Sequence, residues 1–228
     1  YHAWAQGLAA GDWIGTDVFY QAPLYPYVLG LIYTVFGEGP MVVRVCQAVL
    51  GALACVFLAL AGWRLLSKRV GLIAGLLLAC YAPSIFFDGI VQKSVLDAFF
   101  LCLALALLSG LMHDPTRRWA WLWVGVTIGF LVLTRENALV FVVPILAWLL
   151  WWQRHLARER FVLAAFLLAG LSAVLLPVAT RNLAVSGEFY LTTSQFGPNF
   201  YIGNNADASG IYQPLRFGRG DPPFLLFF

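Results

Sequence analysis

The chain has 228 residues, of which 61% are hydrophobic, 16% are aromatic and only 11% are charged. A soluble domain is typically about half apolar and about a quarter charged, so this composition excludes an ordinary soluble protein and indicates an integral membrane protein. The formal net charge of +3 is too small to indicate nucleic acid as a partner.

Residues 1–40 differ from the rest because polar side chains interrupt the apolar ones while aromatic residues abound. Amphipathic pieces rich in aromatic residues are typical of the membrane–water interface. Glycines and prolines divide the stretch into shorter parts. The pattern predicts a juxtamembrane loop with two short amphipathic helices, near 1–10 and 24–36, joined by an irregular segment.

Six apolar segments follow, at about 41–63, 70–87, 95–112, 119–133, 138–152 and 161–180. About 20 residues span a bilayer as a helix, and long apolar runs without a period of two favour helices over a barrel. One helix over 119–152 would reach about 50 Å, well beyond a hydrocarbon core of about 30 Å, so two short spans are expected there. The sequence predicts an all-α polytopic membrane protein with a bundle of about six helices over 41–181.

The loops between these segments differ in charge from one side to the other. With alternating spans, one side receives eight bases and two acids: Arg64, Lys68, Arg69, Arg117, Arg118, Arg154, Arg158 and Arg160, with Asp114 and Glu159. A surplus of Arg and Lys marks the cytoplasmic side, so the remaining polar chemistry is expected outside the cytoplasm. The last stretch, 182–228, is predicted to be a truncated non-cytoplasmic segment, with a strand or extended piece at 189–194.

The first cluster of polar residues on the outer side lies in the loop before the second short helix. It contains Asp12, Asp17, Gln21 and Tyr25 among several aromatic rings. Aromatic rings stack on the apolar face of a pyranose while carboxylates accept its hydroxyl groups, so the cluster predicts a substrate-binding surface. The alternative is an interfacial aromatic belt with solvated acids.

The second cluster joins Asp88 to Lys93 between two apolar runs. A carboxylate and an ammonium at one opening suit general-base or metal chemistry together with phosphate binding. Lys93 and Asp97 are four residues apart, which places them on one helical face where they could pair. The alternative is that these residues are the solvated ends of two spans, with Lys93 extending to the interface.

Two further clusters complete the outer side. Arg135 and its neighbours Glu136 and Asn137 lie at the turn between two short spans, and a guanidinium at the membrane boundary suits a lipid-linked phosphate. The alternative is a simple pair between Arg135 and Glu136. Arg181 with Asn182 begins the fourth cluster, and Gly and Asn residues at 203–210 predict a structured loop whose amides face a ligand, or else a plain turn. The binding residues expected there are Asn199, Tyr201, Asn204 and Asn205.

In their order and common side, these motifs resemble the bacterial C-type (GT-C) glycosyltransferases, and within them the protein-mannosyltransferase/aminoarabinose-transferase-like membrane enzymes. The motifs that carry the resemblance are Tyr1-His-Ala-Trp-Ala-Gln6, Gly11-Asp-Trp13, Gln21-Ala-Pro-Leu-Tyr-Pro-Tyr27, Asp88 to Lys93, Leu133-Thr-Arg-Glu-Asn137, and Arg181-Asn182 with the 203–210 loop. The resemblance runs the length of the chain. It implies inverting transfer of a sugar from a polyprenyl-phosphate donor to a lipid, glycan or protein acceptor, on the periplasmic face of a bacterial inner membrane.

The resemblance also implies roles for individual residues. Asp88 maps onto an outward catalytic acid, and Lys93, Arg135 and Arg181 map onto bases that bind the donor phosphate. In the family, an acidic pair that supplies the first catalytic Asp precedes aromatic residues like Tyr1, so that position is expected upstream of this sequence and the chain on its own is expected to be inactive. Some members carry an acid and a lysine where this chain has Gln21 and Ala22. No metal ligands are predicted, although a divalent metal is left open as a cofactor.

Two other hypotheses compete with the transferase. A transporter or flippase of lipid-linked substrates would place charges near the membrane centre on matching halves, whereas here they gather at one surface and no repeat is visible. A non-catalytic fragment is the third hypothesis, because the first acid is missing.

Overall fold

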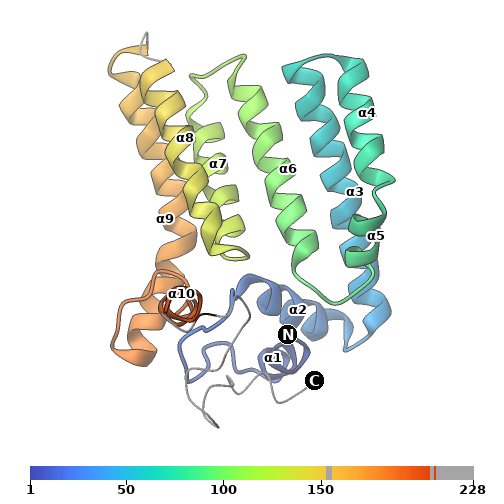
Figure 1. The fold of residues 1–228 in the computed structure, drawn as a ribbon, viewed down its shortest axis with the longest axis vertical. Helices are drawn as coiled ribbons and strands as arrows, with labels where there is room; N and C mark the ends of the chain where they lie inside the picture. Colours follow the sequence, from blue (N-terminus) through green and yellow to red (C-terminus); the bar gives the residue numbers. More distant parts are fainter. Residues whose placement is uncertain (153–155, 206–207, 209–228) are drawn as a thin grey trace.

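The computed structural model describes residues 1–152, 156–205 and 208, and every regular element in this part of the chain is a helix. Figure 1 shows a bundle of upright helices with shorter helices lying across one of its ends. This confirms the all-α prediction. The described residues contain no strand, so the piece expected at 189–194 is irregular backbone.

Two short helices form the lower end of the bundle in Figure 1: α1 (His2–Ala9) and α2 (Leu24–Phe36). They lie where the aromatic and glycine pattern predicts them. The two helices pack closely because Gly30 faces Leu8, and a Cβ atom at Gly30 would lie 2.7 Å from the Leu8 Cβ. Tyr25 and Leu29 are buried between α1 and the bundle, which fixes the pair against the upright helices.

The upright helices occupy all six apolar segments. They are α3 (Pro40–Leu65), α4 (Lys68–Ala79), α5 (Ala82–Asp88), α6 (Ser94–Leu111), α7 (Arg118–Val132), η1 (Glu136–Phe141), α8 (Val142–Ala147), η2 (Trp148–Trp152) and α9 (Glu159–Ser186). In the described part, α3, α6 and α9 are long and apolar enough to cross a membrane, and α4 with α5 makes a fourth candidate bent by 54°. The protein is therefore membrane-embedded, while the number of six spans stays a prediction.

Helices α7 and α9 make the tightest contact in the bundle core. A Cβ atom at Gly125 would collide with the Leu167 carbonyl, and one at Gly170 would collide with the Leu122 carbonyl. Small residues at such crossings let membrane helices approach until their backbones touch. This contact holds α7 against the middle of α9, and it thereby positions the loop that follows α7.

The two ends of the bundle differ in charge as the loop count predicts. The lower end in Figure 1 carries α1, α2, α10 (Phe196–Asn204) and the starts or ends of α3, α5, α6, α7 and α9. The opposite end, called the basic end below, carries the loops at 66–67, 112–117 and 156–158. Its described bases are Arg64, Lys68, Arg69, Arg117, Arg118, Arg158 and Arg160, while Arg154 lies outside the described residues. Which end faces the cytoplasm stays a prediction.

Candidate functional site

Ten of the fourteen predicted site residues line three cavities at the lower end of the bundle, and Tyr25, Tyr201, Asn204 and Asn205 line none of them. The loop cavity, of about 590 Å³, is lined by Asp12, Asp17, Gln21, Tyr27 and Arg181, among others. The cation cavity, of about 550 Å³, is lined by Lys93, Thr134, Arg135, Glu136, Asn137 and Asn199, among others. A third cavity, of about 370 Å³, contains Asp88 with Arg44 and Ser84 between α3, α4 and α5.

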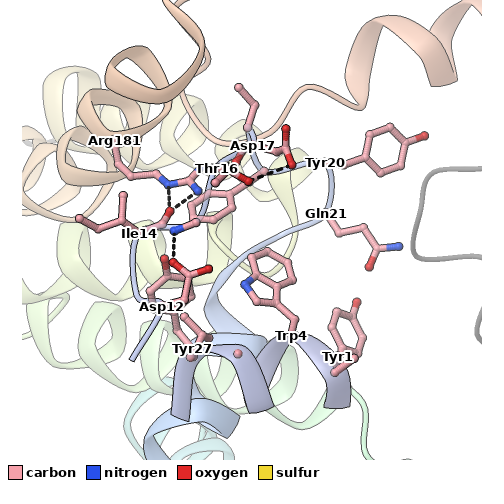
Figure 2. Close-up of a pocket in the computed structure, with 16 residues that line it drawn as sticks. Tyr1, Trp4, Asp12, Ile14, Thr16, Asp17, Tyr20, Gln21, Tyr27 and Arg181 are labelled. Atoms are coloured by element: carbon pink, nitrogen blue, oxygen red, sulfur yellow. Dashed lines mark hydrogen bonds between the residues drawn. The ribbon is translucent and has the colours of Figure 1, made fainter. Parts of the chain in front are cut away.

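Arg181, near the end of α9, holds the loop cavity together (Figure 2). Its Nε donates a hydrogen bond to the Ile14 carbonyl at 2.7 Å, and its Nη2 donates to the same oxygen. Its Nη1 donates to the Asp17 carbonyl at 2.7 Å, and the guanidinium lies 3.9 Å from the centre of the Phe19 ring. Arg181, the base expected to bind phosphate, therefore uses most of its five N–H donors in hydrogen bonds to the backbone of the first loop.

The two acids of the loop cavity stand in different local structures. The carboxylate Oδ1 of Asp12 accepts a hydrogen bond from the Gly15 N–H at 2.9 Å, which closes a turn. Gly15 has φ +67 and lies against Arg181, so a larger residue fits neither the backbone nor the space. Within the described ranges, the one side-chain hydrogen bond of Asp17 is a long one of 3.3 Å, which its Oδ2 accepts from the Thr16 hydroxyl. Asp17 is thus the less constrained acid.

Lys93 and Arg135 meet at the cation cavity although they come from different loops. Lys93 precedes α6 and donates from Nζ to the Thr134 carbonyl at 2.7 Å. The next residue, Arg135, donates from Nε to Asp97 Oδ2 at 2.6 Å. The expected pairing of Lys93 with Asp97 is therefore replaced by two bonds to the loop after α7. The reason is that this loop descends beside the start of α6 and supplies a partner to each residue.

The surroundings of Lys93 change its acidity. Partial burial lowers the pKa of the Lys93 ammonium, and nearby Arg135 lowers it further, while Asp97 and Glu136 act in the opposite direction. Burial dominates because it removes water from the charged form. Lys93 consequently loses its proton at a lower pH than a lysine in water.

Glu136 does not pair with Arg135. Its carboxylate instead binds the segment that follows α9. Its Oε1 accepts hydrogen bonds from the Thr193 hydroxyl and, at 2.7 Å, from Gln195 Nε2. Asn182 is buried in α9 and donates to the Thr192 carbonyl at 2.8 Å. These bonds fold the segment back beside the cation cavity. Sequence reasoning missed Thr193 and Gln195, because no local pattern connects them to a residue some 60 positions away.

The loop cavity and the cation cavity adjoin each other. Gln21 lines the first and its neighbour Ala22 lines the second. Tyr1 also lines the loop cavity, and its phenol is close enough to Asp97 and Arg135 for both charges to affect the pKa of its hydroxyl. Burial raises the pKa of the Tyr1 hydroxyl, and Asp97 raises it further. The two cavities therefore form one region at the lower end of the bundle.

Asp88 is separated from this region. Its carboxylate lies against Gly51 of α3, where a Cβ atom would collide with Oδ2. Gln47 in α3 fixes the loop by donating to the Asp88 carbonyl at 2.7 Å and to the Ile90 carbonyl at 2.8 Å. Asp88 thus lines a different cavity from Lys93, and the expected common opening for the two is not formed.

Tyr25 lies in the core and not at a substrate surface. The side chain is almost fully buried, and its hydroxyl donates to Gln47 Oε1 at 2.6 Å. The ring of Tyr1 packs edge-on against it, with 5.2 Å between ring centres. The expected exposure of Tyr25 fails because α2 presents this face to α3.

In the fourth cluster, residues 196–204 form helix α10, so Gly203 and Asn204 end a helix, and half of the loop expected at 203–210 lies outside the described residues. Asn199 lines the cation cavity between Phe196 and Phe200. Asn204 and Asn205 direct amides to backbone carbonyls of their own helix, at Phe200 and Tyr201, with distances of 2.9 Å each. Tyr201 is exposed. Gly210 lies outside the described residues.

Within the part of the chain that the structure describes, no three His, Cys, Asp or Glu side chains gather where they could hold a metal ion. The carboxylates of the loop cavity and Asp88 lie in different cavities. We therefore derive no chemical step through a metal.

A sequence model of the family described as dolichyl-phosphate-mannose-protein mannosyltransferase matches residues 20–179, which is 160 of the 228 residues. The match covers Lys93, Asp97 and Arg135 but not Asp12, Asp17 or Arg181. No curated protein and no solved structure gives a significant match. The family and the apolar helices together make this a membrane glycosyltransferase that uses a polyprenyl-phosphate sugar donor. The chain belongs to the dolichyl-phosphate-mannose-protein mannosyltransferase family.

Proposed function

We propose that this protein transfers a sugar from a polyprenyl phosphate to a hydroxyl group of a lipid, glycan or protein on the periplasmic face of a bacterial inner membrane. The donor phosphate binds at the cation cavity, and the sugar and acceptor occupy the loop cavity. One observation carries the proposal: Lys93 and Arg135, from separate loops, both line one cavity beside apolar helices.

The cation cavity suits a lipid-linked phosphate. Arg135 is 53% exposed and, in the part of the chain that the structure describes, forms hydrogen bonds through Nε alone, so its Nη groups can face a phosphate as a fork of two donors. Lys93 adds a second positive charge held by the Thr134 carbonyl. Cations at this point stabilise the charge that develops on the departing phosphate. The polyprenyl tail then extends along the apolar surface of the bundle.

The loop cavity suits a neutral ligand with many hydroxyl groups. Backbone carbonyls take up most of the N–H donors of Arg181, so the carboxylates of Asp12 and Asp17 are the charged groups left to bond a ligand. Trp4 and Tyr27 offer ring surfaces at the same cavity (Figure 2). Carboxylates accept hydrogen bonds from hydroxyl groups and rings pack on the apolar face of a sugar.

The transfer itself needs a base on the acceptor side. A carboxylate takes the proton of the acceptor hydroxyl, and the oxygen forms a bond to the anomeric carbon. The bond from that carbon to the phosphate oxygen breaks, and its electron pair leaves with the polyprenyl phosphate. We assign the base to Asp17, which shares the adjoining cavity and is the less constrained acid. Asp88, the acid that the family resemblance implies, lies in another cavity.

The distribution of charge between the two ends of the bundle supports the proposed orientation in the membrane. The basic end carries seven described Arg and Lys residues against two acids, and the residues that line the cavities belong to the other end. Surplus Arg and Lys stay in the cytoplasm, so the cavities face the periplasm.

The experiment is a transfer assay with the full-length protein in liposomes, using a radiolabelled polyprenyl-phosphate mannose and cell-envelope acceptors. We expect Lys93→Ala and Arg135→Ala to abolish labelling, while Arg69→Ala, an exposed base at the basic end, keeps it. Labelling by both cavity variants at the level of the unchanged protein would contradict the proposal.

A further inference from the structure

We propose that Asp97 is a positioning residue of the donor-phosphate site: it orients the Arg135 guanidinium toward the cation cavity. The inference rests on the proposed function, because it gives the phosphate site a residue beyond Lys93 and Arg135. Asp97 does not line the cavity itself, so it acts through Arg135.

The geometry of the pair is asymmetric. The Asp97 side chain is 14% exposed and rooted in the first turn of α6, whereas Arg135 is 53% exposed on a loop. The bond of 2.6 Å uses Nε, which lies on the side of the guanidinium facing the stem. Within the described residues, the two Nη groups have no hydrogen-bond partner. Asp97 therefore fixes the plane of the guanidinium and leaves its outer edge to a ligand.

Stability does not account for Asp97. Its second oxygen, Oδ1, is buried and has no hydrogen-bond partner among the described residues. A buried acceptor without a partner costs free energy, and such a group calls for a functional explanation. The hydrogen bond to the half-exposed Arg135 adds little to the free energy of unfolding, because water screens the two charges. The N-terminal end of α6 stabilises the negative charge only in part.

The positioning role opposes what charge alone predicts. Asp97 places a negative charge behind a site that binds a negative phosphate, so its removal would strengthen binding if only the summed charge mattered. If Asp97 instead holds Arg135 in the geometry that a phosphate needs, its removal weakens binding. The direction of the change therefore separates the two explanations.

The experiment measures undecaprenyl phosphate binding to the purified full-length protein in detergent, together with the thermal unfolding midpoint. We expect Asp97→Asn to weaken binding about 10-fold or more, the range of a charge-assisted hydrogen bond, without lowering the midpoint. Asp97→Glu keeps the carboxylate and is expected to restore most of the affinity. In the transfer assay, Asp97→Asn should raise the donor KM more than it lowers kcat. Asp114→Asn, an acid at the basic end, is the matched control.

The outcomes are separable. Unchanged or tighter binding by Asp97→Asn, with Arg135→Ala impaired, would overturn the positioning role and leave the proposed function standing. A lowered midpoint in both Asp97 variants, with no recovery in Asp97→Glu, would show a structural role and overturn it as well. If the unchanged protein fails to bind the lipid, the phosphate site and this inference both fall.

Discussion

The loop cavity and the cation cavity each contain one arginine, and the two arginines are in opposite states. Arg181 is surrounded by acceptors: two backbone carbonyls of the first loop, the Asn182 side chain and the face of Phe19. Among the described residues, Arg135 has a single side-chain hydrogen-bond partner, Asp97, on its inner edge. An arginine that anchors a loop and an arginine that binds an anion cannot be told apart from the sequence. The number of guanidinium N–H donors that have no partner in the described structure distinguishes them.

This difference between the two arginines indicates whether a neutral or an anionic group suits each cavity. At the loop cavity the N–H donors of Arg181 are taken up by backbone carbonyls, and the carboxylates of Asp12 and Asp17 remain for hydroxyl groups. At the cation cavity, Lys93 and Arg135 outnumber the one acid that lines it, Glu136, whose Oε1 is already bonded. The two halves of a polyprenyl-phosphate sugar, an anion and a neutral ring, match these two cavities.

The largest effect is expected at the carboxylates, and it tests whether the loop cavity holds the reacting hydroxyl. We expect Asp17→Asn to lower kcat about 100-fold or more, because general-base catalysis contributes on that scale. Asp88→Asn serves as the comparison and should lower kcat far less. Transfer kinetics in liposomes measure both. The reverse ranking would return the catalytic role to Asp88 and dissociate the loop cavity from the chemistry.

The next effect concerns the base that has donors to spare. Arg135→Ala removes two Nη groups from the cation cavity, so undecaprenyl phosphate should bind about 10- to 100-fold more weakly. The unfolding midpoint should hardly move, because the side chain is half exposed. Arg69→Ala controls for the loss of one positive charge. Equal binding by the two variants would remove the distinction between the arginines.

Arg181→Ala should produce the opposite profile. It removes hydrogen bonds to the Ile14 and Asp17 carbonyls and the contact with Phe19, so we expect a loss of about 2 kcal/mol in stability. Undecaprenyl phosphate binding should change less than in Arg135→Ala. Limited proteolysis of the loop at 12–19, with Arg64→Ala as a control at the basic end, reports the loosening. A loop that stays protected would show that Arg181 is not its anchor.

Much of the fold follows from the apolar pattern. Each of the six apolar segments is helical, since long apolar runs in a membrane must satisfy their backbone hydrogen bonds internally. The common end of 88–93 and 134–137 also follows from alternating helices, and the bond from Lys93 to the Thr134 carbonyl shows it directly. Helix α10 escapes prediction because Gly, Pro and Asn at 197–205 indicate turns locally.

The partners inside the site could not be predicted in the same way. A spacing of four places Lys93 near Asp97, but a third chain segment, the loop after α7, competes for both. Its approach depends on the contact of α7 with α9, a property of distant glycines. Gln47, some 40 residues away in the sequence, likewise holds the backbone of Asp88 by a hydrogen bond to its carbonyl, and Asp88 then lies outside the site. Local sequence names the reactive groups, whereas the packing of helices decides which of them meet.

The smallest effect is a pH dependence confined to the cation cavity. Burial lowers the pKa of Lys93, so its charge is lost before a free lysine, with a pKa of about 10.4, would titrate. Undecaprenyl phosphate binding should therefore weaken in the alkaline range, below that value. Folding responds with the opposite sign: between the folded and unfolded pKa values the unfolded chain holds more protons, so this group makes stability rise with pH.

Lys93→Arg separates the two responses, because guanidinium stays charged throughout this range. Binding and unfolding midpoints measured from about pH 7 to about pH 10 should show a flatter binding profile in the variant, and its stability should no longer rise. If the unchanged protein binds undecaprenyl phosphate equally across the range, Lys93 does not supply the charge that the cation cavity offers, and Arg135 alone distinguishes the two cavities.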